Sequence, residues 1–116
     1  MTITDGSGVN TTAGTKPRLY YKKSTDANTY VGNTSADNGW KYVEATGAGP
    51  FNFLTSYALL QSAVVAGDII QYFVVAQDLA ATPNVGINSG TFNAVPTSVA
   101  LTSPIPRECR RIGGAL

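Results

Sequence analysis

The alternation of apolar and polar side chains is most informative in residues 67–78, GDIIQYFVVAQD, which hold more strand-forming residues than any other stretch of the chain. A strand with one solvated face alternates apolar and polar positions. Here one alternate set is Ile70, Tyr72, Val74 and Ala76, and the other is Ile69, Gln71, Phe73 and Val75. Only Gln71 interrupts the apolar character, so we expect both faces of this strand to be at least partly covered.

Four other stretches carry strand signals, and runs of Gly, Pro, Asn, Asp and Ser separate them. They are residues 17–23, 40–45, the start of 50–60, and 85–95, and a short β-prone piece at 2–5 precedes them. The second half of 50–60 fits either a strand or a turn of helix. About six short strands at this spacing predict an all-β antiparallel sandwich or barrel.

Length and composition refine this picture. A chain of 116 residues predicts one domain, and charged residues make up only 13 %, against a usual ~25 %. Three prolines interrupt the pattern from Pro96 onward. We therefore predict a domain over residues 1–96 and an irregular or disordered tail over 97–116.

The distribution of charge bears on partners. Residues 1–106 have a net charge of −1, whereas 107–116 have a net charge of +2. A nucleic-acid interface needs a basic stripe on the folded body, so we expect no nucleic-acid partner. No apolar run approaches the ~20 residues of a membrane helix, so we also expect no membrane insertion. The first residues, MTITDGSG, lack the features of a signal peptide.

The residue types limit the chemistry that the chain can perform. It has no histidine, and Cys109 is its only cysteine, which removes the commonest general base and any disulfide within the chain. Asp68 and Asp78 stand at opposite ends of one predicted strand, about 30 Å apart, and cannot act as a pair. We expect a protein that is not an enzyme and that has no catalytic residue, no cofactor and no metal site. Calcium ligation, by Asp5 with Ser7 or by Asp26 with Asp37 and Asn38, is the alternative to turn formation by these side chains.

The run LYYKKSTDANTY…GWKYVEA…PFNFLTSYALL…AGDIIQYFVVAQD resembles a bacterial immunoglobulin-like or fibronectin type III-like module over roughly residues 1–95. The resemblance implies an immunoglobulin-like antiparallel β-sandwich of about six to seven strands. It also implies a structural or adhesion role in a larger exported protein, at the cell surface or outside the cell. The stretch around Tyr72 resembles a tyrosine corner, in which the hydroxyl bonds back to the preceding turn; the alternative is a plain core aromatic.

Two departures from this family lead to a prediction about assembly. Little precedes residues 2–5, where such modules have further strands, and the ending SPIPRECRRIGGAL does not resemble the end of a module. We therefore expect a fragment truncated at its N-terminus. An edge strand left without its neighbour exposes backbone donors and acceptors. We predict that another copy of the chain completes this edge by strand exchange, giving a homo-oligomer.

A different function remains open beside the structural one. Carbohydrate-binding modules use exposed aromatic side chains flanked by polar groups. Tyr30 lies within the polar connection 24–39, and Trp40 directly follows it. These two residues are the candidate ligand-binding residues, with a glycan as the ligand; for Trp40 the alternative is core packing. Other expected partners are neighbouring domains of the parent protein. A third interpretation is a fragment without independent function.

Overall fold

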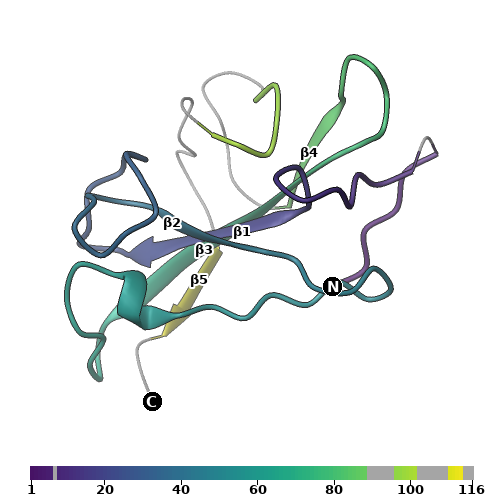
Figure 1. Cartoon of the computed structure of the whole chain (residues 1–116). Helices are drawn as coiled ribbons and strands as arrows, with labels where there is room; N and C mark the ends of the chain where they lie inside the picture. The colour runs from purple at the N-terminus through teal and green to yellow at the C-terminus, as the bar shows by residue number, and fades with distance from the viewer. Residues whose placement is uncertain (7, 89–95, 102–109, 114–116) are drawn as a thin grey trace.

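The computed structural model describes residues 1–6, 8–88, 96–101 and 110–113, of which 88 and 110–113 enter through their backbone alone. The fold is all-β (Figure 1). Its elements in chain order are β1 (Arg18–Lys23), β2 (Lys41–Glu44), the 3₁₀ turn η1 (Tyr57–Leu59), β3 (Ile69–Gln77), β4 (Val85–Asn88) and β5 (Arg110–Gly113).

All five strands belong to one antiparallel sheet with β3 at its centre. The order is β2-β1-β3-β4, and β5 also pairs with β3. Along one edge β3 pairs with β1, with Tyr21 opposite Tyr72. The other edge is shared, because β5 pairs with the first half of β3 and β4 with the second half. The strands predicted at 17–23, 40–45 and 67–78 are confirmed, as is the start of 85–95; residues 89–95 lie outside the described part.

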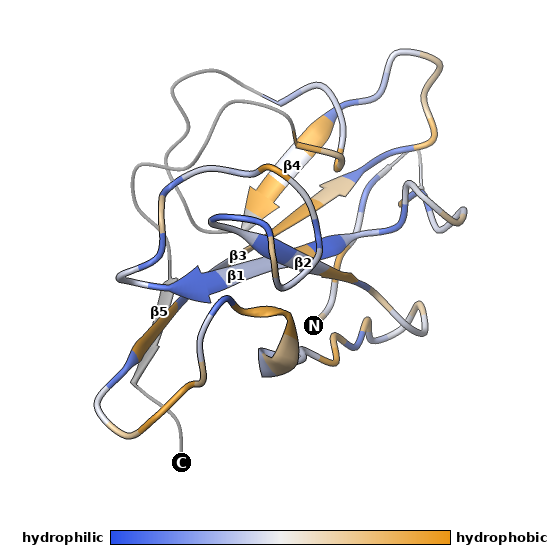
Figure 2. Cartoon of the chain, turned by 60° about the vertical axis from the view of Figure 1, so that its left-hand side comes forward, coloured by the Kyte–Doolittle hydropathy of each residue, from blue (hydrophilic) through white to orange (hydrophobic). Residues whose placement is uncertain are grey.

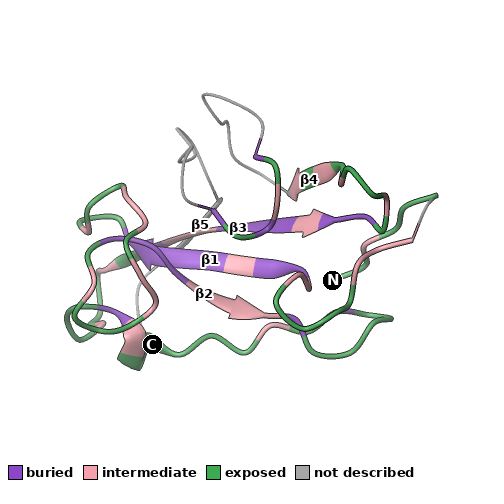
Figure 3. Cartoon of the chain, turned by 45° about the horizontal axis from the view of Figure 1, so that its top comes forward, coloured by how far each residue is buried: buried purple, intermediate pink, exposed green. Residues whose placement is uncertain are grey.

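Both faces of the sheet are covered, as the pattern in β3 predicts. One face carries a cluster formed by Tyr20, Trp40, Phe73, Val75, Val99 and Leu101. The other carries Tyr21, Leu60 and Ile70, with Leu19, Val43, Leu59, Val64 and Tyr72 packed around them. Figure 2 shows the hydrophobic character of β3 and β4, and Figure 3 shows how far β1 and β3 are buried. Within the described residues the cover consists of loops and irregular segments.

Two predicted strands are not strands in the structure. Residues 50–60 make one isolated bridge, between Asn52 and Thr46, and then leave the edge of the sheet. They cross a face of the sheet instead, where Ser56 bonds to the Tyr21 hydroxyl and the chain turns into η1. The β-prone residues 2–5 also form no strand. In both cases a β-compatible sequence serves as cover, because the sheet has an apolar face to bury there.

Two parts of the segment predicted as a tail, residues 97–116, contact the sheet. Val99 and Leu101 are buried in the same cluster as Tyr20, whereas Thr97 before them and Ala100 between them are exposed. The backbone of β5, Arg110–Gly113, pairs with β3, although its sequence shows no strand alternation. A short edge strand gains its hydrogen bonds from the existing edge of β3, so it needs no alternation of its own. Cys109 lies outside the described residues.

Candidate functional site

The aromatic side chains proposed for ligand binding are part of one packed group on a face of the sheet. The Tyr20 ring stacks on Phe73 with centroids 5.2 Å apart, and Trp40 meets Phe73 edge-on at 4.9 Å. Tyr30 and Tyr42 pack against Tyr20 at 5.8 and 5.5 Å. These are the offset and edge-on arrangements that aromatic side chains favour in protein interiors.

Within this group, Trp40 is a core residue. Its exposed fraction is 1 %, and its indole Nε1 donates a hydrogen bond to Asn28 Oδ1 at 2.9 Å. The indole therefore offers no free face on which a sugar could stack. Tyr30 is half-buried, and burial raises the pKa of its hydroxyl. Of the two candidate residues, only Tyr30 keeps surface that a ligand could reach.

Two cations border the aromatic group and contact its rings. The Arg18 guanidinium lies 3.9 Å from the centroid of the Tyr42 ring, and donates to the Tyr20 hydroxyl and to the Gly14 carbonyl, both at 3.3 Å. Lys22 Nζ lies 5.2 Å from the Trp40 ring. Such cation–π contacts stabilise a cation that has left water. Both side chains therefore contribute to packing.

Two tyrosine hydroxyls that sequence reasoning missed hold covering segments onto the sheet. The Tyr20 hydroxyl donates to the Val99 carbonyl at 2.5 Å and accepts from the Leu101 amide at 3.1 Å. On the opposite face, the Tyr21 hydroxyl donates to the Ser56 carbonyl at 2.6 Å and accepts from the Ser56 amide at 3.2 Å. The signal for them was the tyrosine pair itself, because neighbouring strand residues point to opposite faces.

Tyr72, the predicted tyrosine corner, lies in the middle of β3 opposite Tyr21. It packs against the cluster of Tyr21, Leu60 and Ile70. Its hydroxyl makes no hydrogen bond to another residue that the structure describes, so the corner stays a prediction.

The aspartates serve as turn acceptors. Asp37 accepts from the Thr34 hydroxyl and amide, which lowers the pKa of its carboxyl. Asp26 separately accepts from the Lys23 amide at 3.0 Å. Asp26 and Asp37, two of the candidate calcium ligands, therefore act in separate turns. In the described part of the chain no three His, Cys, Asp or Glu residues gather where they could hold a metal ion.

A lysine is buried beside the polar connection. Lys41 in β2 is 0 % exposed, and its ammonium group donates to the carbonyls of Asp37 and Gly39. Burial lowers its pKa. These two bonds hold the end of the polar connection against β2.

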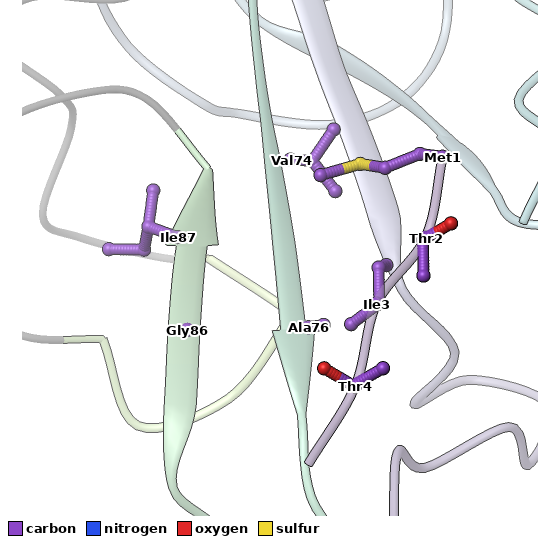
Figure 4. A pocket seen from close by; sticks show the side chains of 8 residues that line it. All are labelled: Met1, Thr2, Ile3, Thr4, Val74, Ala76, Gly86 and Ile87. Atoms are coloured by element: carbon purple, nitrogen blue, oxygen red, sulfur yellow. The ribbon is translucent and has the colours of Figure 1, made fainter.

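The described surface also contains two shallow hollows beside the first residues of the chain. One, of about 300 Å³, lies between residues 1–4 and strands β3 and β4, with Val74, Ala76 and Ile87 among its lining residues (Figure 4). The second, of about 280 Å³, lies on the side of Val9 and Phe51. The linings are mainly apolar, and no cluster of ionisable groups faces either hollow.

No helix in the described part of the chain has the length and apolar character needed to cross a membrane. Comparison of the chain with protein-family models, with curated proteins and with solved structures finds no match. The resemblance to immunoglobulin-like modules therefore rests on the sequence pattern, and the chemistry of the folded chain has to carry any functional conclusion.

Proposed function

We propose that the chain is a non-catalytic structural or adhesion module of a larger exported protein, located at the cell surface or outside the cell. It would act by folding stably between neighbouring domains and by associating with a second copy of itself. The main support for the proposal is the course of β3. One end of this strand pairs with β5, near the C-terminus, and its other end bonds to residues 8–10, near the N-terminus.

The geometry of β3 supports a mechanical role. At its first half β3 pairs with β5 near the C-terminus. At its far end, Val9 bridges Asp78, the Asn10 amide donates to the Gln77 carbonyl at 2.8 Å, and Leu79 donates to Gly8. Antiparallel hydrogen bonds lie perpendicular to the strands. A pull on the two ends of the chain therefore runs along β3 and loads several of these bonds together.

The use of the polar side chains supports a non-catalytic role. The hydroxyls of Tyr20 and Tyr21, the carboxyls of Asp37 and Asp78, and the Lys41 ammonium group all bond to loop backbone. Groups committed to backbone bonds stabilise loops and are poorly placed to take up a substrate. The arrangement suits a module whose task is to remain folded.

Single-molecule stretching tests the mechanical role. We expect a clear unfolding force when the domain is pulled from its two ends. The matched control is the same domain pulled from residues 13 and 46, because the start of β1 pairs with the end of β2 and the pull would break their bonds one after another. A lower force in the control supports the proposal. Equal forces, or no resolvable force in the end-to-end geometry, would contradict it.

We also propose that the fold is completed to a β-sandwich. Phe51 exchanges two backbone hydrogen bonds with Met1, both 2.7 Å long. Its neighbour Asn52 exchanges two with Thr46, both 2.8 Å long. Consecutive residues that bond to opposite sides are the pattern of a middle strand. These residues therefore support the start of a second layer, which a strand from another copy of the chain would extend.

Glycan binding is the alternative function. Tyr30 and Tyr42 are both half-buried, with ring centroids 6.2 Å apart, and their remaining exposed edges could contact a sugar ring. A glycan array with the wild-type chain and with Tyr30→Ala tests this. Binding that the substitution abolishes would favour the alternative, whereas no binding by the wild type would leave the structural role.

A further inference from the structure

Two extended stretches of the fold differ in how their backbones are satisfied. The outer edge of β2 is protected, because the Asn33 side chain imitates a neighbouring strand. Its Oδ1 accepts from the Tyr42 amide at 2.7 Å, and its Nδ2 donates to the Tyr42 carbonyl at 3.1 Å. Beside it, the Trp40 amide donates to the Thr29 carbonyl at 2.8 Å. Another chain cannot add to this edge without displacing both contacts.

Residues 53–55 have no such protection. Their backbone groups form no hydrogen bond to any residue that the structure describes, although Phe51 and Asn52 before them and Ser56 after them are all bonded. The run crosses beneath the sheet as an extended segment before η1 (Figure 1). Leu54 is 83 % exposed, the largest fraction among the exposed apolar side chains of the described residues, and the nearby Tyr57 is 40 % exposed.

The sequence around this segment also lacks the usual safeguards of an edge. Proteins protect free edges with charged side chains, prolines, bulges or a covering segment. No charged residue occurs between Glu44 and Asp68, and the segment from Phe51 to Leu60 contains no proline. Two copies of the segment could therefore approach each other without like-charge repulsion between these residues.

We infer that residues 53–55 are the interface through which two copies of the chain associate. The segment pairs antiparallel with the same segment of the second copy about a two-fold axis, with Leu54 facing Leu54 of the partner subunit. A two-fold interface uses the same patch on both subunits, and an antiparallel pair of identical strands has this symmetry by construction. The inference rests on the self-association proposed above and assigns it to one segment.

The first test is the molar mass in solution, measured by light scattering with reductant present over a wide range of concentration. We expect the wild type to dimerise and Leu54→Lys to weaken the dimer by at least about tenfold, which corresponds to about 1.4 kcal/mol. The substitution places two like charges opposite each other across the axis. The matched control is Val31→Lys, an equally drastic change at a position that is 64 % exposed, and it should leave the dimer unchanged.

The second test is a crosslink that does not depend on weakening the dimer. Residues directly opposite in an antiparallel pair have Cα atoms about 4.5–5.5 Å apart, within the range of a disulfide. In a Cys109→Ser background, Leu54→Cys should form a covalent dimer on mild oxidation, and Val31→Cys should not.

The outcomes separate the inference from the proposal beneath it. A wild type that stays monomeric at all concentrations would remove both the self-association and this interface. A wild-type dimer that Leu54→Lys leaves intact, together with no crosslink through Leu54→Cys, would overturn the interface alone. Circular dichroism of each variant establishes that it is folded before its mass is interpreted.

Discussion

At the scale of single residues, the hydroxyls of Tyr20 and Tyr21 organise both faces of the sheet. They are neighbours in β1, so their rings point to opposite faces. Each hydroxyl takes up one backbone amide and one backbone carbonyl, at residues 99–101 on one face and at Ser56 on the other. When an irregular segment packs on the sheet, some of its backbone amides and carbonyls lose their hydrogen bonds to water. These two tyrosine hydroxyls replace some of the lost hydrogen bonds.

Removing the Tyr20 hydroxyl tests this role. In Tyr20→Phe the Val99 carbonyl and the Leu101 amide lose their partner in the interior, and an unsatisfied buried group costs about 1–3 kcal/mol. Tyr21→Phe should cost less, because its bonds to Ser56 are only partly buried. Tyr57→Phe, at a position 40 % exposed, is the control and should stay within about 0.5 kcal/mol of the wild type. Urea denaturation measures all three; a Tyr20→Phe variant as stable as the control would contradict the role.

Alkaline pH gives a second test at this scale. Burial raises the pKa of Tyr20 and Tyr21 above their ordinary value of 10.0. The folded state therefore holds these protons more tightly than the unfolded state. Their contribution to stability is complete below pH 10 and is lost as pH rises through the raised pKa values. In a pH titration, the tyrosinate absorbance of these residues should appear together with the loss of the circular-dichroism signal. Full ionisation before any unfolding would contradict this.

At the scale of elements, the polar connection 24–39 is an organised cover for the edge of β2. Thr29 and Asn33 bond to the outer edge of β2, and the Lys41 ammonium group binds the end of the loop from within. Gly39 permits this path. Its φ is +84°, and a Cβ atom there would lie 1.9 Å from the Thr29 carbonyl oxygen, so only glycine fits.

The pair Gly39→Ala and Gly14→Ala separates backbone strain from steric conflict. Gly14 has a φ of +89°, but a Cβ atom there would meet nothing within 4 Å. Gly14→Ala should therefore cost about 1–2 kcal/mol from the left-handed backbone alone. Gly39→Ala should cost about 4 kcal/mol or more, because the loop has to move away from β2. Thermal denaturation compares the two; equal losses would mean that the loop yields freely.

The elements that could be predicted from the sequence are those whose own side chains carry the signal. β1, β2 and β3 show alternating or continuously apolar positions, and their pairing follows. Residues 50–60 show the same signal but cover a face of the sheet. The local pattern does not indicate whether a β-compatible segment will pair with the edge of a sheet or pack on its face. β5 and the burial of Val99 depend on β3 and Tyr20, far away in the sequence.

The same limit applies to the candidate site. Trp40 could be recognised as aromatic and next to a polar loop, but its burial depends on Phe73 and on the side chain of Asn28. The sequence does not indicate the role of Asn33, because an asparagine whose side chain bonds to a strand edge cannot be told by sequence from an asparagine in a turn. Roles that a residue acquires from distant partners are visible only once the chain is folded.

At the scale of the whole molecule, stability depends on both ends of β3. Before its start, Asp68 accepts from the Val65 amide and pairs with Lys23 at 3.0 Å. After its end, Asp78 accepts from the amide and the side chain of Asn84 and from the Ala80 amide. Each remaining strand except β2 pairs with β3, so loosening its ends loosens the whole sheet.

Acid should therefore unfold the domain as a unit. Hydrogen bonds from Val65 lower the pKa of Asp68, and those from Asn84 lower the pKa of Asp78, below the ordinary value of 3.8. Because the unfolded state then binds more protons, this stabilisation is present above pH 3.8 and is lost as pH falls through the lowered values. We expect the free energy of unfolding to be nearly constant from about pH 5 to 7 and to fall below about pH 4. Asp78→Asn should be less stable at pH 7 and show a smaller fall in acid, since an amide cannot accept both Asn84 bonds. Urea denaturation at a series of pH values measures this, and parallel curves for the two proteins would show that Asp78 does not couple β3 to pH.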